Sequence, residues 1–241
     1  MCCNLIYTPS GVKWFGYMCC WKKEFNMCDK SRHVSLGFTD VKYPAGTHMC
    51  LLYNDEKERR EVIAKYLQYG LLSNEKVNYF ADNMTPLEVI TWLENMDVNL
   101  PRDKQNLQFA VSPAIETYCP DSSFHFEEMI ARLKKYYANS IGEGFIGCRV
   151  SGEMSWALKN IPGTENLIEY ESQVNTMIDS HPITAICQYN VDQFNGEFIF
   201  DVLQVHPFLI VHGQLINNPT YVKPAEYINK NKEKYFNNHG K

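Results

Sequence analysis

Residues 47–56 read THMCLLYNDE and decide the fold class of this chain. A strand-like segment, His48–Tyr53, runs directly into a charged segment that favours a helix, so we expect the first β-α junction of an α/β domain. A nucleotide-binding fold places a glycine-rich phosphate loop at this junction. Residues 54–58, NDEKE, contain no glycine and supply carboxylates instead. The junction therefore disfavours hydrolysis of a nucleoside triphosphate.

The length and the charge balance limit the possible functions. The chain has 241 residues, which suffices for one main domain with a sizeable core. It carries 28 acidic and 23 basic side chains, a net charge of −5, and its basic residues are scattered except in the last twelve residues. Phosphate contacts need a concentrated basic face, so direct binding of nucleic acid by this chain is disfavoured.

Neither a membrane span nor a secretory signal is expected. The longest apolar stretches, such as Ile183–Cys187 and Phe208–Val211, have the length of strands and not of a membrane-spanning helix. The N-terminus lacks the basic region, apolar core and cleavage site of a signal peptide, which predicts a cytoplasmic protein. In that compartment the nine cysteines are expected to be thiols or metal ligands and not disulfides.

Strand and helix patterns alternate after residue 46, which calls for a mainly parallel sheet with helices on both faces. We expect strands at His48–Tyr53, Val77–Ala81, Leu107–Val111, Phe145–Val150, Ile183–Tyr189 and Phe208–His212, and helices at Asp55–Leu72, from Pro86, and at Phe126–Tyr137, Glu165–Ile178, Phe194–Val205 and from Pro224. The predicted domain plan is a cysteine-rich N-terminal extension (1–33), a main domain (34–228) and a polar C-terminal tail (229–241).

His48 and Cys50 are two residues apart, so on a strand their side chains share one face. One interpretation is structural, because buried cysteines act as small hydrophobic residues and a buried histidine can be a hydrogen-bonded core residue. The other is a ligand or metal site, since thiolate and imidazole are good donors for zinc or iron. Two ligands do not complete a metal site, and the candidates to complete it are Cys148, Cys187, His206 and His212.

Two further segments carry candidate binding residues. The segment after the fourth strand has a Gly152-Glu153 turn followed by Trp156, which suits a pocket with a carboxylate and an aromatic wall at the carboxyl ends of the strands. The same pattern also fits a helix N-terminus with a core tryptophan. Glu171 and Asn175 are four residues apart on a predicted helix and share a face, which fits either a pocket wall or a solvated surface.

The first 28 residues hold a separate group of cysteines, Cys2, Cys3, Cys19, Cys20 and Cys28. Their spacing matches neither the paired cysteines of zinc ribbons nor common iron–sulfur motifs. A metal site, free thiols and a redox-responsive role all remain open for them.

Several unusual segments occur in an order that resembles the MEDS family, the DcmR-type sensory domain of methanogens and methylotrophs. They are residues 36–38 (LGF), 46–53 (GTHMCLLY), 144–158 (GFIGCRVSGEMSWAL), 169–171 (EYE), 187–189 (CQY) and 206–207 (HP). The resemblance covers about Val34 to Pro224. It implies a divergent RecA/KaiC-like fold without a phosphate loop, and a domain that senses small carbon compounds. The family positions carry over onto His48, Cys50, Glu153, Trp156, Glu171 and His206. No helix-turn-helix or kinase segment is recognised here.

Three functions follow as hypotheses. The first is a non-catalytic sensory domain that binds a small organic ligand, of the one-carbon class implied by the resemblance, and acts through a protein partner or a homodimer. The second is a redox sensor that holds zinc, iron or haem through His48, Cys50 and the N-terminal Cys19, Cys20 or Cys28. The third is a thiol-dependent transferase with Cys50 as nucleophile and His48 or Glu153 as base.

Overall fold

The computed structural model describes residues 32–101 and 107–230. The predictions for the cysteine-rich extension, including Cys19, Cys20 and Cys28 as metal ligands, and most of the polar tail lie outside the described residues. The expected helix at Pro224 is present as α7 (Pro224–Lys230).

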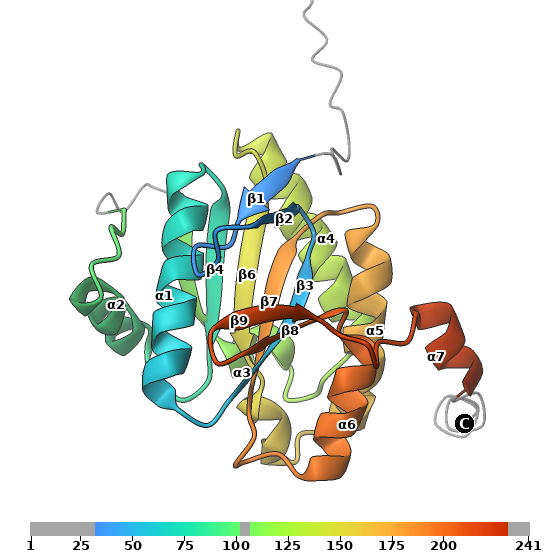
Figure 1. Ribbon diagram of the computed structural model, residues 1–241. Coiled ribbons are helices and arrows are strands. Elements are labelled where there is room, and N and C mark those ends of the chain that lie inside the picture. The colour runs from blue at the N-terminus through green and yellow to red at the C-terminus, as the bar shows by residue number, and fades with distance from the viewer. Residues whose placement is uncertain (1–31, 102–106, 231–241) are drawn as a thin grey trace, which may run out of the picture.

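A mainly parallel sheet forms the centre of the molecule (Figure 1), as the sequence predicts. Its strands run in the order β5-β4-β6-β7-β3-β8-β9, and only the pair β8–β9 is antiparallel. The strands are β3 (His48–Tyr53), β4 (Lys76–Ala81), β5 (Phe109–Pro113), β6 (Cys148–Glu153), β7 (Thr184–Asn190), β8 (Phe208–Val211) and β9 (Gln214–Asn217). A small antiparallel pair, β1 (His33–Ser35) and β2 (Lys42–Pro44), precedes the sheet.

Helices cover both faces of the sheet, in agreement with the alternating pattern (Figure 1). One face carries α1 (Glu56–Leu72) and α2 (Pro86–Asn95), whose buried residues belong to one hydrophobic cluster. The other face carries α3 (Ala114–Tyr118), α4 (Phe126–Gly142), α5 (Leu167–Ile178) and α6 (Gly196–Val205), which share a second cluster. The short helices η1 (Ser155–Lys159) and η2 (Thr164–Asn166) connect β6 to α5.

Alternate side chains of strand β3 point to opposite faces of the sheet and so belong to different parts of the core. Met49 and Leu51 belong to the cluster under α1 and α2, whereas Cys50 belongs to the cluster under α4, α5 and α6. His48 lines a cavity in that second cluster. The predicted shared face of His48 and Cys50 is therefore confirmed.

Helix α1 begins where the charged segment predicts. The side chain of Asp55 accepts a hydrogen bond from the backbone N–H of Lys57 at 2.8 Å and so caps the helix. The carboxylates that argue against a phosphate loop thus have a local role, because negative charge is favourable at a helix N-terminus.

Several expected boundaries differ from the structure, among them the end of the helix expected at Phe126–Tyr137, which continues to Gly142. Two of the differences have a clear physical cause. The strand expected at Phe145–Val150 is β6, and it continues through the residues expected to form a Gly152-Glu153 turn. Pairing with β4 and β7 on both sides extends the strand to this point. The helix expected from Phe194 starts at Gly196, because the side chain of Asn195 accepts from the N–H of Phe198 at 2.8 Å and caps it there.

Among the residues that the structure describes, none of the helices combines the length and the apolar character needed to cross a bilayer.

Candidate functional site

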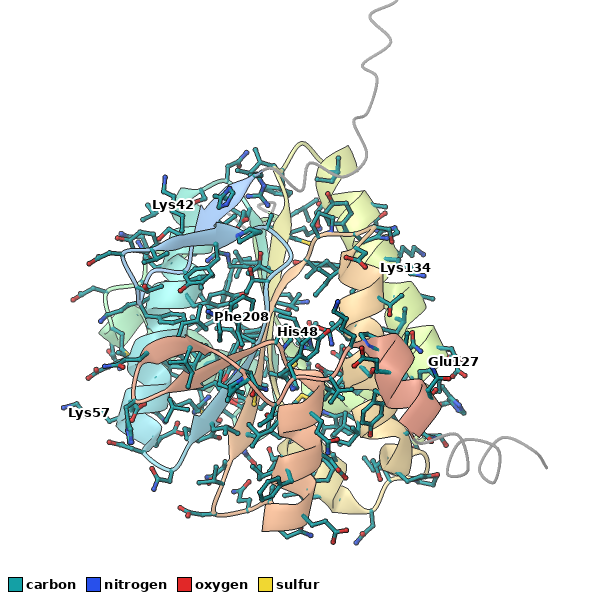
Figure 2. All side chains as sticks on the ribbon, turned by 45° about the vertical axis from the view of Figure 1, so that its right-hand side comes forward. Lys42, His48, Lys57, Glu127, Lys134 and Phe208 are labelled. Atoms are coloured by element: carbon teal, nitrogen blue, oxygen red, sulfur yellow. The ribbon has the colours of Figure 1, made fainter. Side chains whose placement is uncertain are left out.

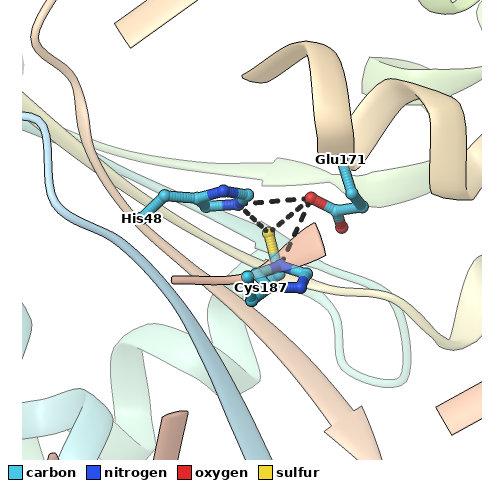
Figure 3. Close-up of side chains that lie close together, drawn as sticks. His48, Glu171 and Cys187 are labelled. Atoms are coloured by element: carbon cyan, nitrogen blue, oxygen red, sulfur yellow. Dashed lines mark hydrogen bonds and ion pairs between the residues drawn. The ribbon is translucent and has the colours of Figure 1, made fainter. Parts of the chain in front are cut away.

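Four side chains from four separate elements meet in the interior of the sheet's second face. His48 comes from β3, Glu171 from α5, Cys187 from β7, and His206 follows α6. We call them the His-Glu-Cys-His cluster. One ligand atom from each lies within 4.8 Å of the others, and all four residues are buried. Figure 3 shows His48, Glu171 and Cys187 pointing toward one another.

The Oε2 atom of Glu171 lies at the centre of the cluster. It is 3.2 Å from His48 Nε2, 3.3 Å from Cys187 Sγ and 3.5 Å from His206 Nε2. Cys187 Sγ is also 3.5 Å from His48 Nε2. The other carboxylate oxygen, Oε1, accepts a hydrogen bond from the hydroxyl of Tyr189 at 2.6 Å. One carboxylate oxygen therefore faces three titratable groups.

Just before His48, the backbone at Gly46 passes very close to the end of α5, and this places His48 under the helix. Gly46 has a φ of +86°, and a Cβ atom at this position would lie 2.7 Å from Ile178 at the end of α5. Only glycine tolerates both the conformation and the distance without a shift. Figure 2 shows His48 in the interior, while Lys42, Lys57, Glu127 and Lys134 lie at the periphery.

The tautomer of His48 follows from Asn175. The amide nitrogen of Asn175 donates to the backbone carbonyls of Val205 and Glu171, at 2.7 Å and 3.1 Å. Its Oδ1 therefore faces His48 Nδ1, at 3.1 Å, and must accept a hydrogen bond from it. When His48 is neutral, its Nε2 has no proton and directs a lone pair into the cluster.

His206 has the same tautomer as His48. Its Nδ1 lies 2.8 Å from the carbonyl oxygen of Val202, which can only accept, so Nδ1 carries the proton. Its Nε2 is buried and has no hydrogen-bond partner. The 3.5 Å contact with Glu171 is an ion-pair distance without hydrogen-bond geometry. When both rings are neutral, two imidazole lone pairs and a carboxylate oxygen therefore converge.

The local electrostatics match this arrangement. Burial lowers the pKa of His48, and the nearby His206 lowers it further, so neutral imidazole is favoured. Burial opposes the charged form of Glu171, but His206 and His48 hold the pKa of this carboxyl well below its usual range. Burial and the charge of Glu171 raise the pKa of the Cys187 thiol. Without an added cation, the cluster holds a carboxylate, a neutral His48 and a thiol.

A small, mostly enclosed cavity adjoins the cluster. His48 and Cys187 line it together with mostly apolar residues, among them Val174 and Met177 of α5 and Ala185 of β7. Its volume is about 10 Å³. This is about the space that one water molecule requires.

Glu153 lies elsewhere, in a separate buried network. Its Oε1 accepts from the hydroxyl of Tyr79 at 2.5 Å and from Arg59 at 3.3 Å, and its Oε2 accepts from the backbone N–H groups of Asp82 and Asn83 at 2.8 Å and 2.9 Å. Arg59 also donates to Gln188 at 2.8 Å. We call this the Glu153 network.

Trp156 is a core residue that stacks on Tyr118, with ring centroids 4.7 Å apart, and contacts Phe124. Tyr118 also lines the cavity, so Trp156 lies one side chain away from it. The structure thus brings together His48, Glu171 and His206 of the predicted binding residues, and it places Glu153 and Trp156 outside their cluster.

The remaining cysteine and histidine candidates fall into two groups, those inside the cluster and those outside it. Cys187 and His206 complete the cluster, whereas Cys148 and His212 are not part of it. Cys50 is the register partner of Cys187 on the adjacent strand but lies outside the four-residue set. Burial and the charge of Glu171 raise the pKa of Cys50 well above its usual value, so it stays a thiol, which is a weak nucleophile.

Solved structures define the class of fold. A KaiC-like protein of Pyrococcus horikoshii OT3 aligns with a TM-score of 0.52 and 11% identity, over 74% of this chain and 79% of its own. The flagellar accessory protein FlaH of Methanocaldococcus jannaschii aligns with a TM-score of 0.55 and 12% identity, over 79% of this chain and 90% of its own. The chain therefore has a KaiC/RecA-like α/β fold, and its β3–α1 junction lacks the glycine-rich phosphate loop.

The family model for the MEDS domain, the methanogen/methylotroph DcmR sensory domain, matches residues 47–207. The chain belongs to this family, as the sequence motifs indicate, and carries a sensory, regulatory domain. The transcriptional repressor DcmR of Methylorubrum extorquens is 24% identical over 160 residues, which are 66% of this chain and 57% of the repressor. The aligned part thus spans little more than half the length of that relative.

Proposed function

We propose that this domain senses a small organic effector of one-carbon size, which binds in the small cavity beside the His-Glu-Cys-His cluster. The observation that carries the proposal is the position of the cavity, whose mostly apolar wall meets the polar groups of His48 and Cys187. Small-molecule sites combine an apolar lining with a few placed polar groups.

The size of the cavity supports a very small effector. A volume of about 10 Å³ leaves room for about one water-sized group, so methanol or a methylamine needs only a small displacement of the lining. Met177 lines the cavity and is a flexible side chain that can give way. A haem group is far too large for this space.

Helix α5 offers a route for the signal. Glu171 and Asn175 contact His48, while Val174 and Met177 line the cavity. A change of occupancy would therefore shift one helix, and α5 packs against α4, α6 and α7. In this proposal the shift passes to a partner protein or to a second copy of the chain.

A panel of effectors measured by thermal unfolding tests the proposal. Methanol, methylamine, dimethyl sulfide and dichloromethane are compared with butanol, which is too large for the cavity. We expect at least one small compound to raise the unfolding temperature and butanol to have no such effect.

A matched pair of variants locates the effect. Val174→Ile adds one methylene to the cavity wall and should abolish the response. Val202→Ile makes the same change at a buried residue of α6 that does not line the cavity, and it should keep the response. The proposal is wrong if no small compound stabilises the protein, or if both variants respond equally.

A further inference from the structure

We infer that His48, Glu171, Cys187 and His206 form a binding site for a divalent transition-metal ion of the zinc or ferrous class. The donor set is two imidazoles, a carboxylate and a thiolate. Zinc and ferrous iron both accept mixed nitrogen, oxygen and sulfur ligands, whereas calcium and magnesium prefer oxygen alone.

The separations between donor atoms match a metal centre. Ligand bonds of about 2.0–2.3 Å in a tetrahedron place the donor atoms about 3.3–3.8 Å apart. Four of the six separations between donor atoms are 3.2, 3.3, 3.5 and 3.5 Å. The other two separations, from His206 Nε2 to His48 Nε2 and to Cys187 Sγ, are at most 4.8 Å, so an ion could be bound once the His206 ring moves inward by up to about one ångström.

The count of protons provides an independent argument. His48 and His206 each use Nδ1–H to donate to a fixed acceptor, so in its neutral form each ring directs an Nε2 lone pair toward Glu171 Oε2. The thiol of Cys187 supplies only one proton for these three acceptors. His206 Nε2 is fully buried and has no hydrogen-bond partner, which is costly unless a proton or a metal cation satisfies it. A metal ion would accept all the lone pairs at once.

Groups around the cluster hold the donor side chains in the orientation that metal ligands need. Ligating histidines usually donate their other ring N–H to a carbonyl or carboxylate, which fixes the tautomer and the ring. Asn175 and the carbonyl of Val202 do this for His48 and His206, and Tyr189 holds the distal oxygen of Glu171. All three partners lie outside the donor set.

The site is next to the effector cavity, so an effector could bind near or on the ion. That extension rests on the proposed function, but metal binding does not. A cobalt titration without any effector tests metal binding alone, so metal binding and effector binding can fail independently of each other.

The test uses the full chain, stripped of metal under reducing conditions and titrated with Co²⁺. Cobalt substitutes for zinc and for ferrous iron, and a thiolate ligand gives a charge-transfer band in the near ultraviolet. We expect this band to saturate at one equivalent in a variant whose cysteines 2, 3, 19, 20 and 28 are serine. Elemental analysis of protein purified from zinc-supplemented and iron-supplemented cultures then identifies the native ion.

Variants assign the ligands. Cys187→Ser should abolish the charge-transfer band, and His206→Asn should weaken cobalt binding at least tenfold. Cys50→Ser is the matched control, because Cys50 is buried on the adjacent strand and lies outside the donor set, so its band should remain. Circular dichroism establishes that each variant is folded. If Cys187→Ser does not fold, the Cys50→Ser and His206→Asn titrations still decide whether the cluster binds cobalt.

Three results would overturn the inference. They are the absence of cobalt binding in the variant that lacks the N-terminal cysteines, a charge-transfer band that survives Cys187→Ser, and a band that is lost in Cys50→Ser.

Discussion

The Glu153 network and the His-Glu-Cys-His cluster each bury a carboxylate, from strand β6 and helix α5 respectively, but the two carboxylates differ in how many hydrogen-bond donors face them. Both oxygens of Glu153 accept from N–H or O–H groups, and Arg59 adds a positive charge. Oε2 of Glu171 has only the thiol of Cys187 as a certain donor, and two imidazole nitrogens face it. The first carboxylate is saturated by the chain itself, whereas the second is not.

This difference separates a structural group from a binding group. A buried carboxylate with a full set of donors is part of the fold, because a ligand could only displace bonds that are already made. A buried carboxylate that faces other acceptors gains from a cation or a ligand. The chain holds a third case, Glu75, which pairs with Arg149 and Arg32 and is again saturated.

The largest expected effect comes from breaking the saturated network. Arg59→Ala removes the only charged partner of Glu153 that the structure describes. Removal of one member of a buried ion pair costs about 3–5 kcal/mol. Urea unfolding should show this loss. A loss below about 1 kcal/mol would mean that the Glu153 network does not stabilise the fold.

Addition of metal should affect only the unsaturated cluster. At about 100 times the dissociation constant, Zn²⁺ should raise the free energy of unfolding by about 2.7 kcal/mol. For a domain of this size that is about 5–11 °C in unfolding temperature. Cys187→Ser should remove the shift, whereas Cys148→Ser, at a buried cysteine outside the cluster, should preserve it. Equal shifts in both variants would refute the assignment.

The same isosteric substitution should have unequal effects at the two carboxylates. Glu153→Gln turns an acceptor into an NH₂ group that faces backbone N–H or Tyr79 and Arg59, which costs about 1–3 kcal/mol. In metal-free protein, Glu171→Gln places the NH₂ near the lone pairs of His48 and His206, so it should cost at least about 1 kcal/mol less. Chemical denaturation in the presence of a chelator compares the two, and equal losses would contradict the proton count.

The smallest effect is a pH dependence of the metal-free protein. The pKa of His48 is lowered in the fold from 6.5, and His206, Glu171 and Cys187 face it. As the pH falls through 6.5, the unfolded chain binds a proton that folded His48 resists, so stability decreases. The expected slope is up to about 1.4 kcal/mol per pH unit. His48→Asn keeps a donor for Asn175 and should flatten this slope between pH 7 and 5. An unchanged slope would show that His48 is not its source.

The fold could be predicted from the sequence because the signals are local. The alternation of strands and helices and the glycine-free junction at Asn54 gave the fold class, and the period of two placed His48 and Cys50 on one face. The edge strand β9 was missed because its four residues, QLIN, carry no strong period. The turn expected at Glu153 was wrong because pairing with two neighbours extended β6.

The cluster itself could be predicted only in part. The spacing of Glu171 and Asn175 indicated a shared helix face, and both contact His48. The partnership of His48 with Cys187, 139 residues away, depends on the pairing of β3 with β7. No local pattern distinguishes Cys187 from Cys50, since both are cysteines on buried strands that face each other in register. What decides between them is that Glu171 reaches from α5 to Cys187, at 3.3 Å.

Anomalous diffraction would locate a bound ion in the His-Glu-Cys-His cluster. Crystals of the full chain grown with Zn²⁺ would be measured above and below the zinc absorption edge. We expect one interior anomalous peak among His48 Nε2, His206 Nε2, Glu171 Oε2 and Cys187 Sγ, at about 2.0–2.3 Å from each atom. A zinc-loaded crystal with no peak among these four atoms would contradict this expectation.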